Sequence, residues 1–269
     1  MAFQAESLDL DAEVLHSYHA QVFDWVCELT AGFPVRRILD LGTGTGTGAL
    51  ALAERFGHAQ VIAVDSAAQL LDRCAAKARE RGLAARIRLV QADLNAEWPV
   101  EGPVDLAWAS KSLHHLTAPA DVLARLSRTI RPGGFLAVAE IESFPRFLPD
   151  EAAGGGAELE ERCHAALAGQ IARDLPHLRA DWSSLLKQAG FGVEATRTFT
   201  IDLEPPLPAS AGRYAQASLQ RVRQALDGKL SADDLAALDA LVEDGPGSVL
   251  RRDDLHVRAA TNAWVARRP

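Results

Sequence analysis

The sequence contains, at its most constraining point, Ile38-Leu-Asp-Leu-Gly-Thr-Gly-Thr-Gly-Thr-Gly48, an apolar run that includes Asp40 and continues into four alternating glycines. Glycine suits positions where the backbone takes a positive φ or must approach a ligand closely. A strand that leads directly into a glycine-rich turn and a helix is typical of the nucleotide-binding corner of a doubly wound α/β sheet. Tight packing between strand and helix is the alternative reason for the glycines.

Short apolar runs alternate with longer amphipathic stretches on both sides of this motif. Strands that alternate with helices predict a parallel sheet covered on both faces. The expected strands are Val35–Leu41, Gln60–Val64, Ile87–Gln91, Val104–Ala109, Phe135–Ile141, Phe191–Leu203 and Leu255–Ala266, and the expected helices among them are 46–56, 66–81, 119–131 and Trp182–Ala189. We therefore predict an α/β fold with a doubly wound, mostly parallel seven-stranded sheet.

The regions outside this alternation suggest a division of the chain. Residues 1–34 form a predicted N-terminal helical cap, with one helix over about 9–31. Residues 35–269 form the main domain, interrupted by insertions at about 142–180 and 204–250. Two insertions on one side of a sheet predict a helical lid over a pocket or, equally, an interface in a homodimer.

Composition excludes several classes of protein. The 269 residues include 28 Lys and Arg against 36 Asp and Glu, a net charge of −8, which argues against a nucleic-acid partner. We find no apolar run long enough to cross a bilayer and no signal-peptide pattern at the N-terminus, so we expect a cytoplasmic protein without a membrane partner. Cys27, Cys74 and Cys163 are too few and too scattered for a disulfide framework or a zinc site.

The spacing of the glycines bears on which nucleotide is bound. The dinucleotide fingerprint G-x-G-x-x-G fails here, because Thr47 stands at its third glycine. The spacing is D-x-G-x-G-x-G, from Asp40 to Gly46. At this point the chain resembles the class I S-adenosylmethionine-dependent methyltransferases. The resemblance continues in register over about 35–141 and 181–202, and includes Arg131-Pro-Gly-Gly134 before a strand.

The resemblance implies a site for S-adenosylmethionine at the ends of the first four strands. Asp65 would accept hydrogen bonds from the ribose hydroxyls, although enzymes that use NAD also place an acid there. Asp93 would accept a hydrogen bond from the adenine amino group, and Leu94 would contact the adenine ring. Alternatively, Asp93 caps the turn that follows. The complete implied set is Asp40, Gly42, Thr43, Gly44, Gly46, Asp65, Ser66, Asp93, Leu94, Ala109 and Ser110.

Candidate catalytic residues are fewer. Positioning of the acceptor beside the methyl group is the main contribution expected of the protein, and a general base matters only if the acceptor must lose a proton. His114 and His115 follow the fourth strand, and either could be that base or could simply order the loop. Tyr18, beside His19 on the N-terminal helix, is a third candidate or an ordinary buried residue.

Other polar residues are weaker candidates. Glu140, at the end of the fifth strand, could face the acceptor. We assign Glu142, His164, His177 and His256 to the surface or lid. No pair of acids ends the fourth strand, so we expect no metal.

We therefore predict an enzyme that transfers a methyl group from S-adenosylmethionine to an oxygen, nitrogen or carbon atom of a small molecule. The alternatives are an NAD-dependent oxidoreductase, a catalytically silent regulator that binds the same donor, and an RNA methyltransferase. The acidic charge argues against the last of these.

Overall fold

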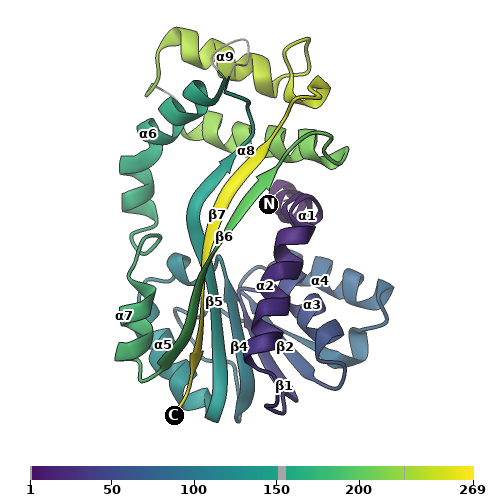
Figure 1. Ribbon diagram of the computed structural model, residues 1–269, viewed down its shortest axis with the longest axis vertical. Coiled ribbons are helices and arrows are strands. Elements are labelled where there is room, and N and C mark those ends of the chain that lie inside the picture. Colours follow the sequence, from purple (N-terminus) through teal and green to yellow (C-terminus); the bar gives the residue numbers. More distant parts are fainter. Residues whose placement is uncertain (1, 151–155, 227) are drawn as a thin grey trace.

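A single mixed sheet organises the chain in a computed structural model that describes residues 2–150, 156–226 and 228–269 (Figure 1). Its seven strands have the order β3-β2-β1-β4-β5-β7-β6. β1 to β5 run parallel, whereas β7 is antiparallel to both of its neighbours. The prediction of a mostly parallel seven-stranded sheet is confirmed. The strands are β1 Arg37–Leu41, β2 Gln60–Asp65, β3 Ile87–Gln91, β4 Val104–Ser110, β5 Ile130–Arg146, β6 Gly192–Leu203 and β7 Val257–Arg267.

Helices cover both faces of this sheet, so its central strands are apolar on both sides. Ile38 of β1 belongs to the core beneath α2 and α3, whereas Leu39 belongs to the core beneath α5 and α7. Figure 1 shows the two helical layers on opposite sides of the sheet. The helices are α1 Ala2–Val14, α2 His16–Leu29, α3 Thr47–Arg55, α4 Ala68–Glu80, α5 Pro119–Thr129, α6 Gly156–Asp174, α7 Trp182–Gln188, α8 Ser210–Ala225 and α9 Ala232–Val242. No helix in these described ranges is both long and apolar enough to cross a bilayer.

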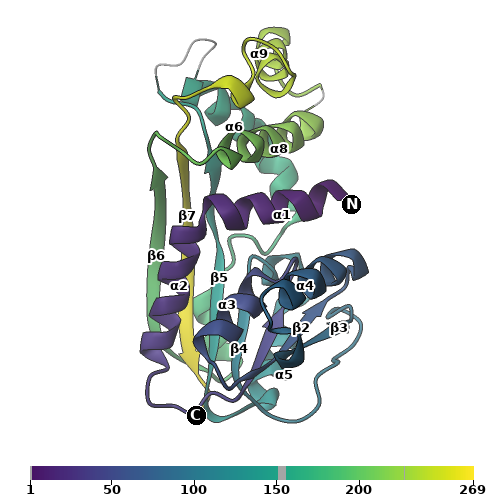
Figure 2. The ribbon, with the colours of Figure 1, turned by 90° about the vertical axis from the view of Figure 1, so that its right-hand side faces the viewer.

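The N-terminal region differs from the single helix predicted over 9–31. Two helices, α1 and α2, meet at Leu15, whose φ of −95° and ψ of 21° lie outside the helical range. Figure 2 shows α1 running across the upper ends of the shorter strands, β1 to β4, while β5, β6 and β7 pass beyond it and α2 runs alongside the sheet. Leu15 is buried at the corner, so burial of the apolar stripe continues through a change of direction. The bend places α1 over the carboxyl ends of the strands.

The fifth strand is longer than predicted at both ends. It begins at Ile130, so the helix before it ends ahead of Pro132, and it continues past Ile141 to Arg146 with register shifts. β5, β6 and β7 extend together beyond the rest of the sheet and lead to α6, α8 and α9 (Figure 1). The insertion predicted at 142–180 therefore begins inside a strand, and its residues 151–155 lie outside the described residues. The division into cap, domain and lid remains a prediction.

Candidate functional site

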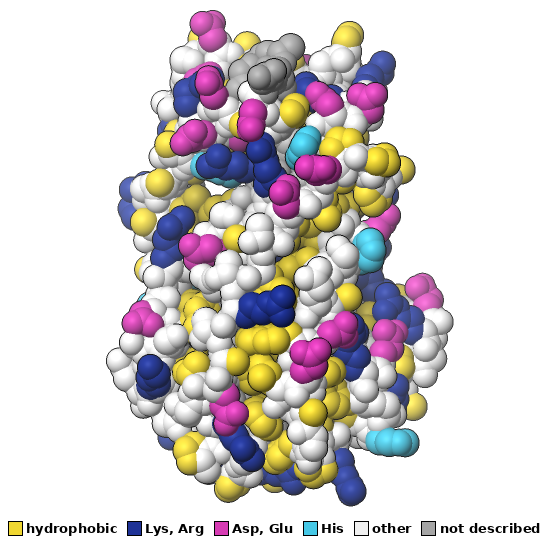
Figure 3. Space-filling view, viewed as in Figure 1, with side chains coloured by type: hydrophobic (Ala, Val, Ile, Leu, Met, Phe, Trp, Pro, Cys, Tyr) yellow, Lys and Arg dark blue, Asp and Glu magenta, His cyan; other side chains and the backbone are white. Residues whose placement is uncertain are grey.

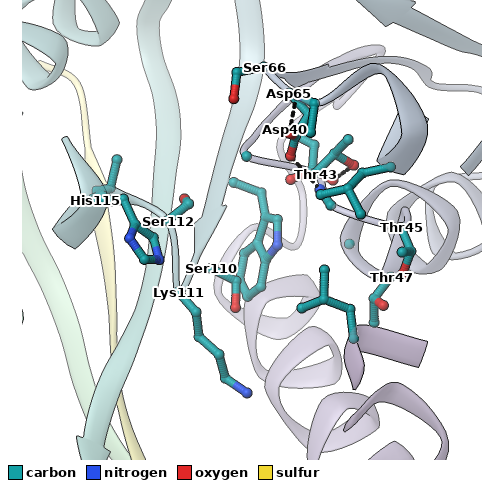
Figure 4. A pocket seen from close by; sticks show the side chains of 18 of the residues that line it. Asp40, Thr43, Thr45, Thr47, Asp65, Ser66, Ser110, Lys111, Ser112 and His115 are labelled. Atoms are coloured by element: carbon teal, nitrogen blue, oxygen red, sulfur yellow. Dashed lines mark hydrogen bonds between the residues drawn. The ribbon is translucent and has the colours of Figure 1, made fainter. Parts of the chain in front are cut away.

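A cavity of about 460 Å³ opens at the carboxyl ends of β1, β2, β3 and β4, where ligands of open α/β sheets bind. Its walls are the loop after β1, the residues that follow β2, β3 and β4, and one side of α1 and α2 (Figure 4). Leu8 of α1 approaches Gly44 of the loop, so the bend at Leu15 is what closes the cavity on that side. None of the described residues beyond Leu116 lines it.

The structure gives a different reason for glycine at each position of the loop after β1. Gly42, Gly44 and Gly46 have φ values of +67°, +56° and +91°, in the left-handed region that favours glycine. A Cβ at Gly42 would lie 2.5 Å from the Cβ of Ser112, and one at Gly46 would lie 2.4 Å from the Sγ of Cys74. Packing thus requires both of these glycines, and Gly46 does not line the cavity, so its implied place in the cofactor set stays a prediction. Gly42 and Gly44 do line it.

Asp65 lies at the end of β2 on the cavity wall, next to Ser66. Its Oδ2 accepts the backbone amide of Gly44 at 2.8 Å, and its Oδ1 accepts that of Ala67 at 2.9 Å. Each carboxylate oxygen has a second lone pair, so both can still accept a ligand hydroxyl. The same carboxylate therefore holds the glycine loop in place and faces the cavity.

Asp40 is buried at the inner end of the cavity. Burial raises the pKa of its carboxyl to about 7, with a further contribution from Asp65, although the Thr43 hydroxyl donates to Oδ2 at 2.6 Å. Asp40 is therefore partly protonated at neutral pH. Thr43, which the resemblance places in the donor site, also lines the cavity.

The remaining implied cofactor residues divide into two groups. Asp93, Leu94 and Ser110 line the cavity, and the Oδ1 of Asp93 also accepts the backbone amide of Asn95 at 2.9 Å. Asp93 thus both forms the turn that was its alternative role and faces the cavity. Ala109 does not line the cavity: side chains alternate along β4, and its side chain packs in the core on the other face, so its place in the donor site stays a prediction.

The two candidate histidines lie in different environments. His115 is exposed at the cavity wall, as Figure 4 shows, and its ring centroid lies 4.2 Å from that of His114. Desolvation, and then the nearby His114, lower the pKa of His115. His114 is buried, and its Nδ1 pairs with Glu140.

Glu140 and Tyr18 are both buried and neither lines the cavity, although the Tyr18 ring lies 6.0 Å from the Nζ of Lys111, which does. Glu140 is buried, and its Oε1 accepts the backbone amide of Leu113 at 2.9 Å, so it supports the loop and does not face an acceptor. The ring of Tyr18 is buried, and its centroid lies 6.1 Å from that of the Phe199 ring. This packing fits the alternative that Tyr18 is an ordinary buried residue of the helix. Its neighbour His19 does line the cavity.

A half-buried ionic cluster in the wall was missed by sequence reasoning. Lys111, with φ of +51°, is the one non-glycine residue of positive φ in the described part of the chain. Its Nζ lies 3.2 and 3.3 Å from the two carboxylate oxygens of Asp11 on α1. Asp11 also pairs with His19 Nε2 at 3.2 Å and accepts the Tyr214 hydroxyl of α8 at 2.9 Å.

The neighbours of Asp11 in this cluster keep its carboxyl ionised. Burial alone would raise the pKa of Asp11, but Lys111, His19 and Tyr214 hold it well below its usual value. Asp11 and Lys111 are 100 residues apart, and Tyr214 is 203 residues from Asp11, so no local pattern signals the contact.

A mixed sheet with an antiparallel β7, and a cavity walled by the glycine loop after β1, together define a Rossmann-like methyltransferase fold. A family profile described as "Methyltransferase domain" matches residues 38–134. The trans-aconitate 2-methyltransferase of Acidovorax sp. (strain JS42) is 32% identical over 209 residues, which cover 71% of this chain and 78% of that protein. The chain therefore belongs to the S-adenosylmethionine-dependent methyltransferases.

Further comparisons agree on the family and the fold. A second trans-aconitate 2-methyltransferase, from Azoarcus sp. (strain BH72), is 40% identical over 101 residues, which span only 38% of this chain and 37% of that protein. The crystal structure of a Bacillus halodurans C-125 protein described as a methyltransferase shares the fold, with a TM-score of 0.57 and 18% identity, over 93% of this chain and 98% of that one. The prediction that S-adenosylmethionine, and not NAD, is the cofactor is confirmed by the family.

Proposed function

We propose that the chain transfers the methyl group of S-adenosylmethionine to a nucleophile of a small molecule, which enters the cavity beside Lys111 and His115. The observation that carries this proposal is the continuity of one cavity from Asp65, after β2, to His115, after β4. A donor held at Asp65 and an acceptor held near His115 would thus share one enclosed space. Trans-aconitate, the acceptor in the names of two relatives, supports a small-molecule acceptor in general.

The residues of the cavity fit this donor. The volume of about 460 Å³ suits a ligand of its size. Asp65 and Asp93 offer carboxylate oxygens at one end, and the glycine loop presents backbone with no side chains at Gly42 and Gly44. When bound, the donor supplies a methyl group already activated on a sulfonium. The contribution of the protein is then to hold the acceptor in line and exclude water, which is worth roughly 7–11 kcal/mol of barrier.

His115 is the general base of this proposal. It lies on the cavity wall, whereas His114 is buried and paired with Glu140. The lowered pKa of His115 keeps its imidazole neutral, and so able to accept a proton, at neutral pH. A positioned base contributes about 10²–10⁴-fold to the rate. Tyr18, buried away from the cavity, has no part in the proposed proton transfer.

Single-turnover kinetics of a His115→Ala variant test this assignment. We expect the rate of methyl transfer to fall by about 10²-fold or more while affinity for the donor stays unchanged. His58→Ala is the matched control, because His58 is exposed in the turn between α3 and β2 and does not line the cavity. A His115→Ala variant that loses only a few-fold would show that the base lies elsewhere or that proximity alone suffices.

A further inference from the structure

The cavity that holds the donor carries a pronounced excess of negative charge. Its described lining includes Asp11, Asp40, Asp65 and Asp93 but only one lysine, Lys111, and no arginine. With Asp11, Asp65 and Asp93 ionised, Asp40 partly protonated and the histidines counted as neutral, these side chains carry a formal charge between −2 and −3. Such a wall suits the donor, which has two positive groups and one carboxylate. It does not suit an acceptor with several carboxylates of its own.

The one lysine of the lining is already paired. Lys111 Nζ lies within 3.2 and 3.3 Å of the two carboxylate oxygens of Asp11, and both side chains are half-buried. Asp11 in turn is held by His19 and by the Tyr214 hydroxyl, so it cannot turn away without leaving those groups unpaired. Taking Lys111 from Asp11 would leave a half-buried carboxylate without its counter-ion, which is unfavourable. Lys111 is therefore not a free cation for an incoming anion.

The presence of His115 at the cavity wall also favours an acceptor that is not a carboxylate. A carboxylate nucleophile carries no proton and needs positively charged side chains, most often arginine, to hold it. A hydroxyl or amine has the opposite needs: no counter-ion, and a group that takes up its proton. His115 is such a group at the cavity wall.

We infer that the acceptor presents an uncharged hydroxyl or amine to the cavity and not a carboxylate, which separates this chain from relatives named for trans-aconitate. This inference rests on the proposed function. In the reaction the acceptor's lone pair forms a bond to the methyl carbon while the carbon–sulfur bond breaks. Sulfur keeps the bonding pair as S-adenosylhomocysteine, and the acceptor proton passes to the His115 imidazole.

A titration with trans-aconitate tests the charge argument. The protein is first saturated with S-adenosylhomocysteine, and trans-aconitate is then titrated at low ionic strength, with heat as the signal. We expect no binding to the wild type at millimolar concentrations. We expect measurable binding to Asp11→Asn, because Lys111 then loses its counter-ion. Tyr214→Phe is the matched control: it removes one hydrogen bond to Asp11 but no charge, and it should behave as wild type.

The chemistry of the product gives a second test that needs only the wild-type chain. The protein is incubated with donor labelled in its methyl group and a metabolite extract of the cells that make it, and the labelled product is treated with mild alkali. An ether or N-methyl product keeps its label, as we expect, whereas a methyl ester releases labelled methanol. With carbon-13 as the label, the NMR chemical shift of the retained methyl group then distinguishes a methyl on oxygen or nitrogen from one on carbon.

The outcomes distinguish a failure of the acceptor assignment from a failure of the proposed methyl transfer. An ester product, a C-methyl product, or binding of trans-aconitate to the wild type would overturn the inference and leave methyl transfer intact. A protein that binds S-adenosylhomocysteine but labels nothing would overturn the proposed function, and the inference with it.

Discussion

The Asp65 carboxylate accepts the backbone amide of Gly44 at 2.8 Å, and so joins the end of β2 to the loop after β1. The contact crosses the floor of the cavity between two neighbouring parallel strands. It explains how a loop with three left-handed glycines keeps one conformation. The donor site thus depends on a side chain that both shapes the loop and faces the ligand.

Replacing Asp65 with alanine should weaken donor binding by about 1.5–3 kcal/mol, because charge-assisted hydrogen bonds are lost. Calorimetric titration with S-adenosylhomocysteine measures this loss. Asp65→Asn separates shape from charge, since it keeps the size of the side chain and one acceptor oxygen, and it should bind with intermediate affinity. An unchanged dissociation constant in Asp65→Ala would show that the ribose is held elsewhere.

Gly46→Ala should destabilise the fold by about 1–3 kcal/mol without entering the cavity. The new Cβ would lie 2.4 Å from Cys74 Sγ, on a backbone whose φ is +91°. Urea unfolding measures the change. Gly57→Ala is the control, because Gly57 has open space around it, and it should be almost neutral. A stable Gly46→Ala that fails only to bind the donor would contradict the packing role.

The buried Asp40 carboxyl should make stability depend on pH. Its pKa is about 7 in the folded chain against an ordinary value of 3.8, so between these values the unfolded chain binds fewer protons than the folded one. Stability from this group is therefore present below about pH 4 and is lost as the pH rises to about 7, by at most about 4 kcal/mol.

The Asp40→Asn variant isolates this effect, because asparagine does not titrate. The difference in unfolding free energy between wild type and Asp40→Asn, measured from pH 4 to 8, should shift against the wild type with rising pH. A difference that stays constant over this range would mean that Asp40 is ionised throughout.

Glu140→Ala should cost about 3–5 kcal/mol of stability, because His114 and the Leu113 amide would lose a buried partner. Glu140→Gln keeps an oxygen for the Leu113 amide and should lose less. Thermal unfolding of the two variants compares them. Equal, small losses would show that the pair contributes little to the loop that carries His115.

Much of the fold follows from local pattern. Buried parallel strands are continuous apolar runs, so β3 matches its predicted bounds of Ile87–Gln91, and the neighbouring strands differ only at their ends. The bend at Leu15 was missed because it contains no glycine or proline: the apolar stripe runs on, and only packing of α1 over the cavity imposes the corner.

Most residues of the predicted donor site line one cavity, because they directly follow successive strands. Gly46 and Ala109 pack against the protein and do not line the cavity, which the motif could not indicate, because a motif does not say which neighbour each position faces. The contact of Asp11 with Lys111 and Tyr214 could not be predicted, because it joins three elements distant in sequence. The roles of the site residues and a homodimer stay predictions.

Hydrogen exchange of the wild-type chain, with and without S-adenosylhomocysteine, tests most directly whether the glycine loop holds the donor. We predict that backbone amides in residues 42–48 and 65–67 exchange more slowly when the compound is bound, and that NAD at the same concentration leaves them unchanged. Protection confined to other parts of the chain, with these amides unaffected, would contradict the assignment of the cavity.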